Sequence, residues 1–363
     1  MNSDRPWEVG ADFHWLGLPS GPFSPWSEPH VWFGLGRAAL LSAWRASQGN
    51  GRDPRSLLIP DYFCPKVTRA WKDAGVNVRF YADDPRWPHP DWDTIASRQG
   101  DWVLAVNYFG LREGRAWREW HREHPFVVMI EDHSHDALSN WAVTSSADYA
   151  FASLRKTFPT PDGALLWSPR GLPLPPEPQT QQWLGSALKL AAMIWKKEYL
   201  EKAHVDPPTK DTFRRFQIDG EEALDESEDP SLSVWSRALL AAGFPQDWRR
   251  QREENVRLLL DLLPESEYFA PLFSTWSEGQ CPFNVVLVFK SHALREAFRS
   301  LLISRGIYAP VHWELEMGKA DHALDLSHRV LTIPADQRYT EQDISRLASI
   351  LTQSLKLPDI ANL

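Results

Sequence analysis

The sequence predicts an α/β protein with a large domain built on a mostly parallel sheet and a smaller C-terminal α/β domain. Short apolar runs alternate with helical patterns between residues 36 and 167, which is typical of βαβ units. A long amphipathic pattern over 247–263 suits a helix that connects two domains. A second, shorter series of strand and helix patterns follows it. We therefore expect a large domain over 1–245 and a small domain over 246–363.

Local signals place each element in turn. The first helix has apolar residues on one face, including Leu40 and Trp44. The most apolar strand is followed directly by Glu131 and Asp132, and Thr340 with Asp343 can cap the last helix. In chain order we expect helix 36–47, strand 56–59, helix 65–74, strands 76–81 and 102–106, helix 115–124, strands 126–130, 149–154 and 164–167, helices 182–202, 231–242 and 247–263, strand 284–289, helix 293–305, strands 309–313 and 329–333, and helix 341–355.

Composition narrows the class of protein. The net charge is -9 and there is no long basic run, so nucleic-acid binding is disfavoured. The acidic block over 219–229 is expected to be a solvated loop. Two cysteines, Cys64 and Cys281, are too few for a disulfide framework, which favours a reducing cytoplasm. The first residues do not resemble a signal peptide, and no apolar stretch is long enough to span a membrane.

Asp132 and Lys156 are the residues most suggestive of chemistry. Each follows an expected strand at its carboxyl end, and such ends converge on the ligand crevice of a parallel sheet. An acid there can keep a ring nitrogen protonated, and a lysine in an apolar setting can form an imine. This pair is typical of pyridoxal phosphate (PLP) enzymes. Alternatively, Asp132 caps a helix and Lys156 faces solvent.

Three further segments can contact such a cofactor. Gly36, Arg37 and Ala38 open a helix whose free N–H groups can bind phosphate, although a glycine before a helix is more often only a turn. Ser153 can donate its hydroxyl to the same phosphate. Tyr62 follows a strand and can stack on a flat ring, with core packing as an equal alternative.

Two sets of residues allow more than one interpretation. His133 and His135 could indicate a metal site, but no third ligand stands at a suitable spacing, so we expect no metal. Arg338 can bind a substrate carboxylate from the small domain or make a structural salt bridge.

The order of these segments resembles the DegT/DnrJ/EryC1/StrS aminotransferases, which are fold-type I PLP enzymes. The resemblance covers residues 30–170 well and 284–355 more faintly. It rests on the helix beginning at Gly36, on Asn107-Tyr108-Phe109-Gly110, on Asp132 with His135 three residues later, and on Lys156 followed by Gly163. It implies that Asp132 lies at the pyridine nitrogen, that His135 lies near the phenolic oxygen, and that Lys156 forms the Schiff base.

The chain departs from the family pattern at three places. Gly36-Arg37 stands where the family has Gly-Thr, Phe151 replaces the serine five residues before the lysine, and Thr157 replaces the asparagine after it. Ser153 instead gives a Ser-x-x-Lys pattern that other fold-type I enzymes have. These departures leave PLP binding expected and the substrate open, with a keto sugar nucleotide as one alternative.

We therefore expect a PLP-dependent aminotransferase that moves an amino group from an amino-acid donor to a keto acceptor. The alternatives are another PLP reaction (elimination, decarboxylation or cyclisation) and an inactive binding protein with the same fold. The resemblance also implies a homodimer with its active sites near the interface. The 19 tryptophans agree with this, since aromatic residues are enriched at interfaces.

Overall fold

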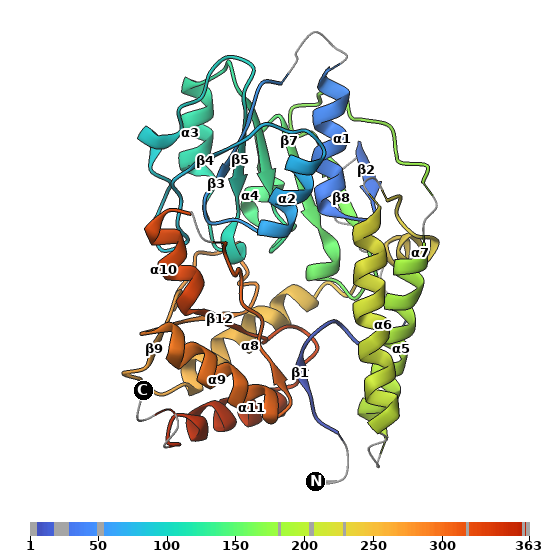
Figure 1. Cartoon of the computed structure of the whole chain (residues 1–363), viewed down its shortest axis with the longest axis vertical. Coiled ribbons are helices and arrows are strands. Elements are labelled where there is room, and N and C mark those ends of the chain that lie inside the picture. The colour runs from blue at the N-terminus through green and yellow to red at the C-terminus, as the bar shows by residue number, and fades with distance from the viewer. Residues whose placement is uncertain are drawn as a thin grey trace.

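The structure is a computed structural model of the chain, and it describes residues 6–17, 29–48, 54–180, 183–202, 207–227, 230–316, 319–357 and 360. Its largest element is a seven-stranded sheet in the order β2-β8-β7-β6-β5-β3-β4. β8 runs antiparallel to both of its neighbours, and the other neighbouring strands are parallel (Figure 1). The strands are β2 (His30–Phe33), β3 (Leu57–Pro60), β4 (Val78–Tyr81), β5 (Trp102–Val106), β6 (Val128–Asp132), β7 (Tyr149–Ser153) and β8 (Ala164–Trp167).

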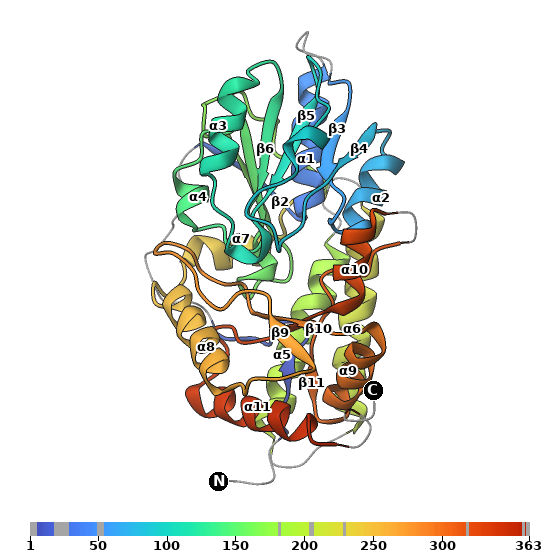
Figure 2. The ribbon, with the colours of Figure 1, turned by 90° about the vertical axis from the view of Figure 1, so that its left-hand side faces the viewer.

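Helices cover both faces of this sheet, as Figure 2 shows. Side chains alternate along each strand, so β6 sends Ile130 into the core beneath α1 and α2 and sends Met129 into the core beneath α3 and α4. Three 3₁₀ turns connect strands and helices. The helices are α1 (Gly36–Gln48), α2 (Pro65–Asp73), α3 (Arg115–Glu123) and α4 (Asn140–Val143), and the turns are Trp92–Thr94, Tyr108–Gly110 and Leu154–Lys156.

The second half of the chain forms a three-stranded antiparallel sheet in the order β12-β10-β9. One face of this sheet packs with apolar residues of α8, α9 and α11 in a core of its own, whereas Val286 of β10 and Val330 of β12 belong to the core that also contains α1 and α2. α7 precedes the long connecting helix α8. The bounds are α7 (Val234–Ala242), α8 (Trp248–Leu262), β9 (Phe269–Pro271), β10 (Val285–Phe289), α9 (His292–Ser304), β11 (Ile307–Tyr308), α10 (Asp321–Arg329), β12 (Val330–Ile333) and α11 (Glu341–Ser354).

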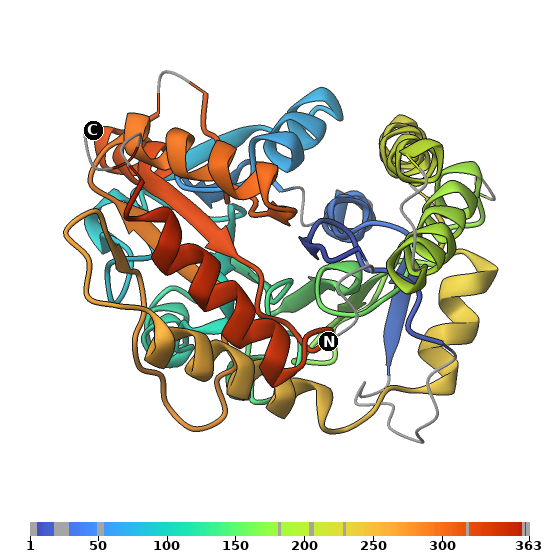
Figure 3. The ribbon, with the colours of Figure 1, turned by 90° about the horizontal axis from the view of Figure 1, so that it is seen from below.

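Two further segments complete the molecule. α5 (Leu184–Glu201) and α6 (Pro207–Glu226) pack together as a helical hairpin, here called the helical arm, which lies apart from α9 and α11 in Figure 3. Residues 7–13, the N-terminal strap, contain β1 (Val9–Gly10), which pairs in parallel with β11. The strap therefore belongs in space to the small domain, although it precedes the large one in sequence.

The expected elements occur in the expected order, but β1, β2, α4, β9 and α10 were not expected, and three expected segments differ from the structure. The expected strand 309–313 is replaced by the two residues of β11, because Pro310 cannot donate a ladder hydrogen bond. The first part of the acidic block 219–229 is helix α6 and not a loop, because Glu221 and Asp225 pair with cations of the large domain; residues 228–229 lie outside the described residues. The strand expected over 126–130 begins and ends two residues later, so Asp132 is its last residue.

The expected cap of the last helix is confirmed: Thr340 and Asp343 form a reciprocal capping box at the start of α11. In the described part of the chain, no helix has both the length and the apolar character needed to cross a bilayer.

Candidate active site

Asp132 and Lys156 both lie at the carboxyl end of the large sheet, because β6 and β7 are neighbouring parallel strands. Asp132 is the last residue of β6 and pairs in register with Phe151 of β7. Lys156 ends the 3₁₀ turn that follows β7. Asp132 lies on the same face of β6 as Ile130, towards α1, and is 8% exposed. Its Oδ1 accepts a hydrogen bond from the Ser134 N–H at 2.8 Å, so the carboxylate is held in place.

His135 lies directly against Lys156. Its Nδ1 accepts the backbone N–H of Phe109 at 3.0 Å, and its Nε2 lies 3.5 Å from the Lys156 Nζ. Burial, and then the charge of Lys156, lower the pKa of His135 well below its usual value. The imidazole is therefore neutral, and because Nδ1 is an acceptor, its single proton is on Nε2. His135 thus carries no charge, and its Nε2–H donor lies on the side of the ring that faces Lys156, where an acceptor atom of a ligand can receive it.

Aromatic rings surround this pair. Phe283 and Phe109 stack on the imidazole of His135, with ring centroids 4.6 and 5.5 Å away. Trp313 of the small domain stacks on it at 5.8 Å, and the same ring lies 5.9 Å from the Lys156 Nζ. Within the described residues, no carboxylate lies within ion-pairing distance of Lys156. The groups that contact its amine are therefore neutral and aromatic.

The turn that contains Phe109 has an unusual backbone. Phe109 has φ 54° and ψ 16°, a left-handed conformation that a bulky residue adopts at a cost of roughly 1 kcal/mol or more. The turn aims the Phe109 N–H at His135, and the Phe109 carbonyl accepts the N–H of Phe283 at 2.7 Å. Gly110 follows with φ 78°, and a Cβ there would lie 2.3 Å from the Cys281 carbonyl oxygen. This close packing holds the unfavourable turn in place.

The start of α1 lies beside β7. A Cβ on Gly36 would come within 3.2 Å of the Ser153 Cβ, so the glycine allows this close approach. The Arg37 side chain turns away from the helix start, because its Nη1 binds Asp225 of α6 at 2.6 Å. The structure thus brings Gly36 and Ser153 together and leaves backbone N–H groups, rather than the Arg37 guanidinium, as the local donors. Ala38 donates its N–H to the Leu35 carbonyl.

Tyr62 is fully buried, which matches the core-packing alternative. Its hydroxyl donates to the His312 carbonyl, and its ring contacts Tyr108 and Trp313. Its stacking on a cofactor ring stays a prediction.

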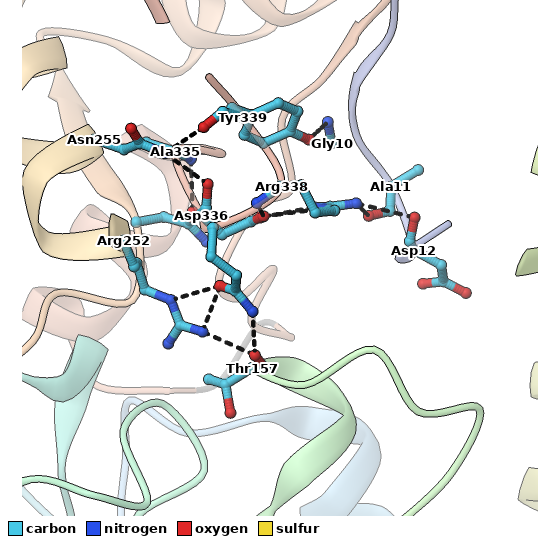
Figure 4. A network of polar contacts seen from close by, with 12 residues as sticks. Gly10, Ala11, Asp12, Thr157, Arg252, Asn255, Ala335, Asp336, Arg338 and Tyr339 are labelled. Carbon is cyan, nitrogen blue, oxygen red and sulfur yellow. Dashed lines mark hydrogen bonds and ion pairs between the residues drawn. The ribbon is translucent and has the colours of Figure 1, made fainter. Parts of the chain in front are cut away.

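Arg338 makes the structural salt bridge that the sequence left open (Figure 4). Its Nε and Nη2 bind the two oxygens of Asp336 at 2.8 and 2.7 Å, and its Nη1 donates to the carbonyls of Ala11 and Asp12. Burial raises the pKa of Asp336, but Arg338 outweighs it and holds that pKa below its usual value. With all three guanidinium nitrogens occupied, binding of a substrate carboxylate by Arg338 stays a prediction.

His133 and His135 point to different surroundings. The Nε2 of His133 lies 2.9 Å from Glu131 on the opposite face of β6, where Trp141 also donates to that carboxylate. Among the described residues, no cluster of three metal-ligating side chains is found.

A cavity of about 610 Å³ opens beside Lys156. It lies between the helical arm, the N-terminal strap and the small domain, where Figure 3 shows the arm and α9 standing apart. Lys156 and His312 border its inner end, and Lys189 and Glu221 border its side on the arm. Burial, and then the charge of Lys156, lower the pKa of His312 to about 3.

Salt bridges join the arm to the turn that carries Lys156. Arg155 binds both oxygens of Glu221, at 2.6 and 2.8 Å, and Lys189 binds Glu221 at 3.0 Å and also Asp12 of the strap. Burial raises the pKa of Glu221, but Arg155 outweighs it, so that pKa lies well below the usual range. The cations at the side of the cavity are therefore already paired.

Sequence reasoning missed Trp313, His312 and Phe283. His312 and Trp313 follow β11, and Phe283 precedes β10. Nothing in their local sequence pattern separates them from aromatic residues of a core. Only the packing of the small domain on the large one brings them to Lys156.

The comparisons with known proteins concern the fold. No family model matches the chain, and no curated protein matches it. Solved structures do. The aminotransferase TlmJ from Streptoalloteichus hindustanus is 16% identical with a TM-score of 0.60, over 90% of this chain and 85% of that chain. PseC of Helicobacter pylori, an aminotransferase involved in the biosynthesis of pseudoaminic acid, is 12% identical with a TM-score of 0.62, over 90% and 86%. The PLP form of Spr1654 from Streptococcus pneumoniae, described as a putative sugar aminotransferase, is 13% identical with a TM-score of 0.60, over 90% and 87%.

These likenesses show the fold. The chain has the large, mostly parallel sheet domain and the small C-terminal domain that the sequence predicts, in the arrangement found in aminotransferases.

Proposed function

We propose that this protein is a PLP-dependent aminotransferase that transfers an amino group from an amino-acid donor to a keto acceptor. The observation that carries the proposal is the position of Lys156. Its amine reaches the carboxyl edge of the sheet, beside the end of β6 that carries Asp132, and meets the neutral His135 at 3.5 Å. This arrangement on this fold supports a lysine that reacts with a carbonyl cofactor.

The residues present fit PLP. Asp132 supplies a fixed carboxylate for a ring nitrogen, and the donor on His135 Nε2 suits an anionic oxygen. At the start of α1, Gly36 lets the backbone approach Ser153, and the first N–H groups of a helix bind phosphate. Lys156 has no carboxylate partner in the described part of the chain, so no ion pair has to be broken before it reacts.

PLP, when bound, acts as an electron sink for the bonds at the substrate's amino carbon. The carboxylate of Asp132 would keep a proton at the ring nitrogen, because a nearby negative charge favours the protonated ring. The amine of Lys156 would hold the cofactor and, as a free amine, would move a proton between carbon atoms as a general base and acid. The Nε2–H of His135 would donate to an oxygen of the cofactor. The rings of Phe283 and Trp313 exclude water from these groups.

A keto sugar nucleotide is the first acceptor to test. The related fold DesI is described in the presence of its TDP-sugar product, and it is 16% identical over 90% of this chain with a TM-score of 0.59. The cavity beside Lys156, at about 610 Å³, is within the usual range for small-molecule sites. The alternative PLP reactions use the same lysine and acid, and the donor half-reaction separates them, because only a transaminase converts PLP to its amine form with donor alone.

We also propose a homodimer in a reducing cytoplasm. Leu184, Ile194 and Trp195 of α5 are 67%, 42% and 43% exposed. Exposed apolar side chains gathered on one arm suit a protein interface. The free state of Cys64 and Cys281 is compatible with the cytoplasm.

The decisive experiment compares wild-type protein with Lys156→Ala after addition of PLP. We expect a visible absorbance band in the wild type, reduction of that band by borohydride with PLP fixed to Lys156, and neither result in the variant. If borohydride fixes PLP to the Lys156→Ala protein as well, the reacting lysine lies elsewhere.

A further inference from the structure

The carbonyl oxygen of Thr157, the residue directly after Lys156, is held by two buried side chains from outside the large sheet. Arg252 of α8 donates to it from Nη2 at 2.8 Å (Figure 4). Gln337 of the loop between β12 and α11 donates to it from Nε2, also at 2.8 Å. Arg252 and Gln337 are each 5% exposed, and Thr157 is 2% exposed. We call these contacts the Thr157 clamp.

The orientation of the Gln337 amide in the clamp follows from the chemistry of Arg252. Arg252 has only donors, so the atom of Gln337 that faces it must be the amide oxygen, which accepts from Nε and Nη2 at 3.1 and 2.8 Å. The amide NH₂ of Gln337 is then directed at Thr157. No carboxylate lies within ion-pairing distance of Arg252 among the described residues, although a buried guanidinium normally has one. Its charge is instead directed at the Thr157 carbonyl and the Gln337 amide.

The loop that carries Gln337 has a second side that borders the cavity. Pro334, Asp336 and Arg338 line the cavity beside Lys156, while Gln337, between the last two, faces Thr157. Asn255 of α8 fixes the same loop by donating to the carbonyls of Asp336 and Tyr339, both at 2.9 Å. A change in position of this loop is therefore transmitted to the turn at Thr157.

We infer that Arg252 and Gln337 are positioning residues that set the backbone of the Lys156 turn according to the position of the small domain. This inference rests on the proposed role of Lys156. The turn itself is short: the N–H groups of Thr157 and Phe158 both bind the Leu154 carbonyl, at 3.0 and 2.8 Å. A turn closed by so few bonds needs an external hold if its last side chain is to be placed accurately.

The test is Gln337→Glu. The new carboxylate keeps, and strengthens, the bond to Arg252, so the contact between α8 and the loop survives. It removes the donor to Thr157 and places an oxygen against the Thr157 carbonyl. The matched control is Asn255→Asp, which makes the same chemical change in the same loop contact without touching Thr157.

Two measurements are made on both variants. The first, without PLP, is amide hydrogen exchange of peptides that cover 154–158. The second is the half-reaction of the PLP-loaded protein with the amino donor. It gives two quantities: the rate at saturating donor and the donor concentration at which the rate is half-maximal. We expect Gln337→Glu to exchange faster at Thr157 and Phe158, and its saturating rate to fall about tenfold, since small misplacements of reacting groups cost one to two orders of magnitude. The donor concentration that gives the half-maximal rate should stay within about twofold of the wild-type value, because the donor site is unchanged.

We expect Asn255→Asp to have a lower melting temperature but, in both measurements, a clearly smaller change than Gln337→Glu, because both side-chain donors to the Thr157 carbonyl remain. The inference is wrong if Gln337→Glu shows wild-type exchange and a wild-type rate, or if Asn255→Asp slows the reaction equally. If the proposed function itself is wrong, wild-type protein gives no absorbance band with PLP. The hydrogen-exchange measurement needs no PLP, so it still tests the clamp in that case.

Discussion

Arg338→Met decides whether Arg338 is a structural residue or a free carboxylate binder. The methionine keeps an apolar stem but removes the guanidinium that binds Asp336 at 2.7 Å and the carbonyls of Ala11 and Asp12. The side chains of Arg338 and Asp336 are only 5% and 8% exposed. Breaking a pair this buried leaves an uncompensated carboxylate, which costs about 3–5 kcal/mol. We expect the free energy of unfolding to fall by that amount.

A double-mutant cycle shows where that loss comes from. Asp336→Asn removes the unpaired carboxylate charge, so the free energy of unfolding of the double variant should fall by less than that of Arg338→Met alone. We expect a loss of about 1–3 kcal/mol, mainly because the carbonyls of Ala11 and Asp12 are left without a donor. Urea unfolding followed by tryptophan fluorescence measures all four proteins. Because Arg338 lowers the pKa of Asp336, this stability is present above the usual carboxyl pKa and is lost as pH falls through the lowered one. An Arg338→Met protein as stable as the wild type, with weaker donor binding, would refute the structural role.

Three further predictions concern the site and the surface. Asp132→Asn should bind PLP, because an amide oxygen can still accept the Ser134 N–H, but it should lose on the order of 10²–10⁴-fold in turnover; full turnover would place the acid elsewhere. His312, with its pKa lowered from 6.5 to about 3, binds a proton more readily in the unfolded chain, so acid should destabilise the protein between these values. The loss is about 1–3 kcal/mol at pH 4.5; His312→Gln should flatten this slope, and an unchanged slope would exclude His312 as its source. Trp195→Glu should shift the homodimer towards monomer in light scattering, and an unchanged mass would move the interface away from α5.

Much of the large domain could be predicted from the sequence because its inner strands, β3 and β5 to β8, are buried on both faces, whereas the half-exposed edge strand β2 was missed. Such strands are continuous apolar runs, and the polar residues at their ends, Asp132 and Lys156, are conspicuous for that reason. The strand containing Asp132 was misplaced by two residues, which did not affect its neighbours in space. Long helices such as α8 were also predicted well, because their periodic pattern extends over many residues.

The rest of the site depends on contacts between distant segments. Trp313 and His312 follow a strand of only two residues, and no periodicity marks them. Glu221 and Asp225 were expected in a loop because local charge favours solvation, but their partners, Arg155 and Arg37, lie in the large domain. Such salt bridges cannot be inferred from the sequence around one partner alone. The role of Gln337 likewise depends on a backbone carbonyl 180 positions away, at Thr157.

The pairing of β1 with β11 has a consequence for the order of events during synthesis. Val9 pairs with Ile307, and the Gly10 N–H binds the hydroxyl of Tyr339. Because a ribosome adds about 5–20 residues per second, the roughly 300 residues between the two strands take about 15–60 s to appear. Throughout that time the strap has no strand to join, while the large sheet can already be formed from residues before Trp167. One wall of the cavity is therefore added last, after the small domain emerges. A nascent chain stalled before residue 307 should be cleaved by protease near Gly10, and should become resistant there only once Tyr339 has left the ribosome.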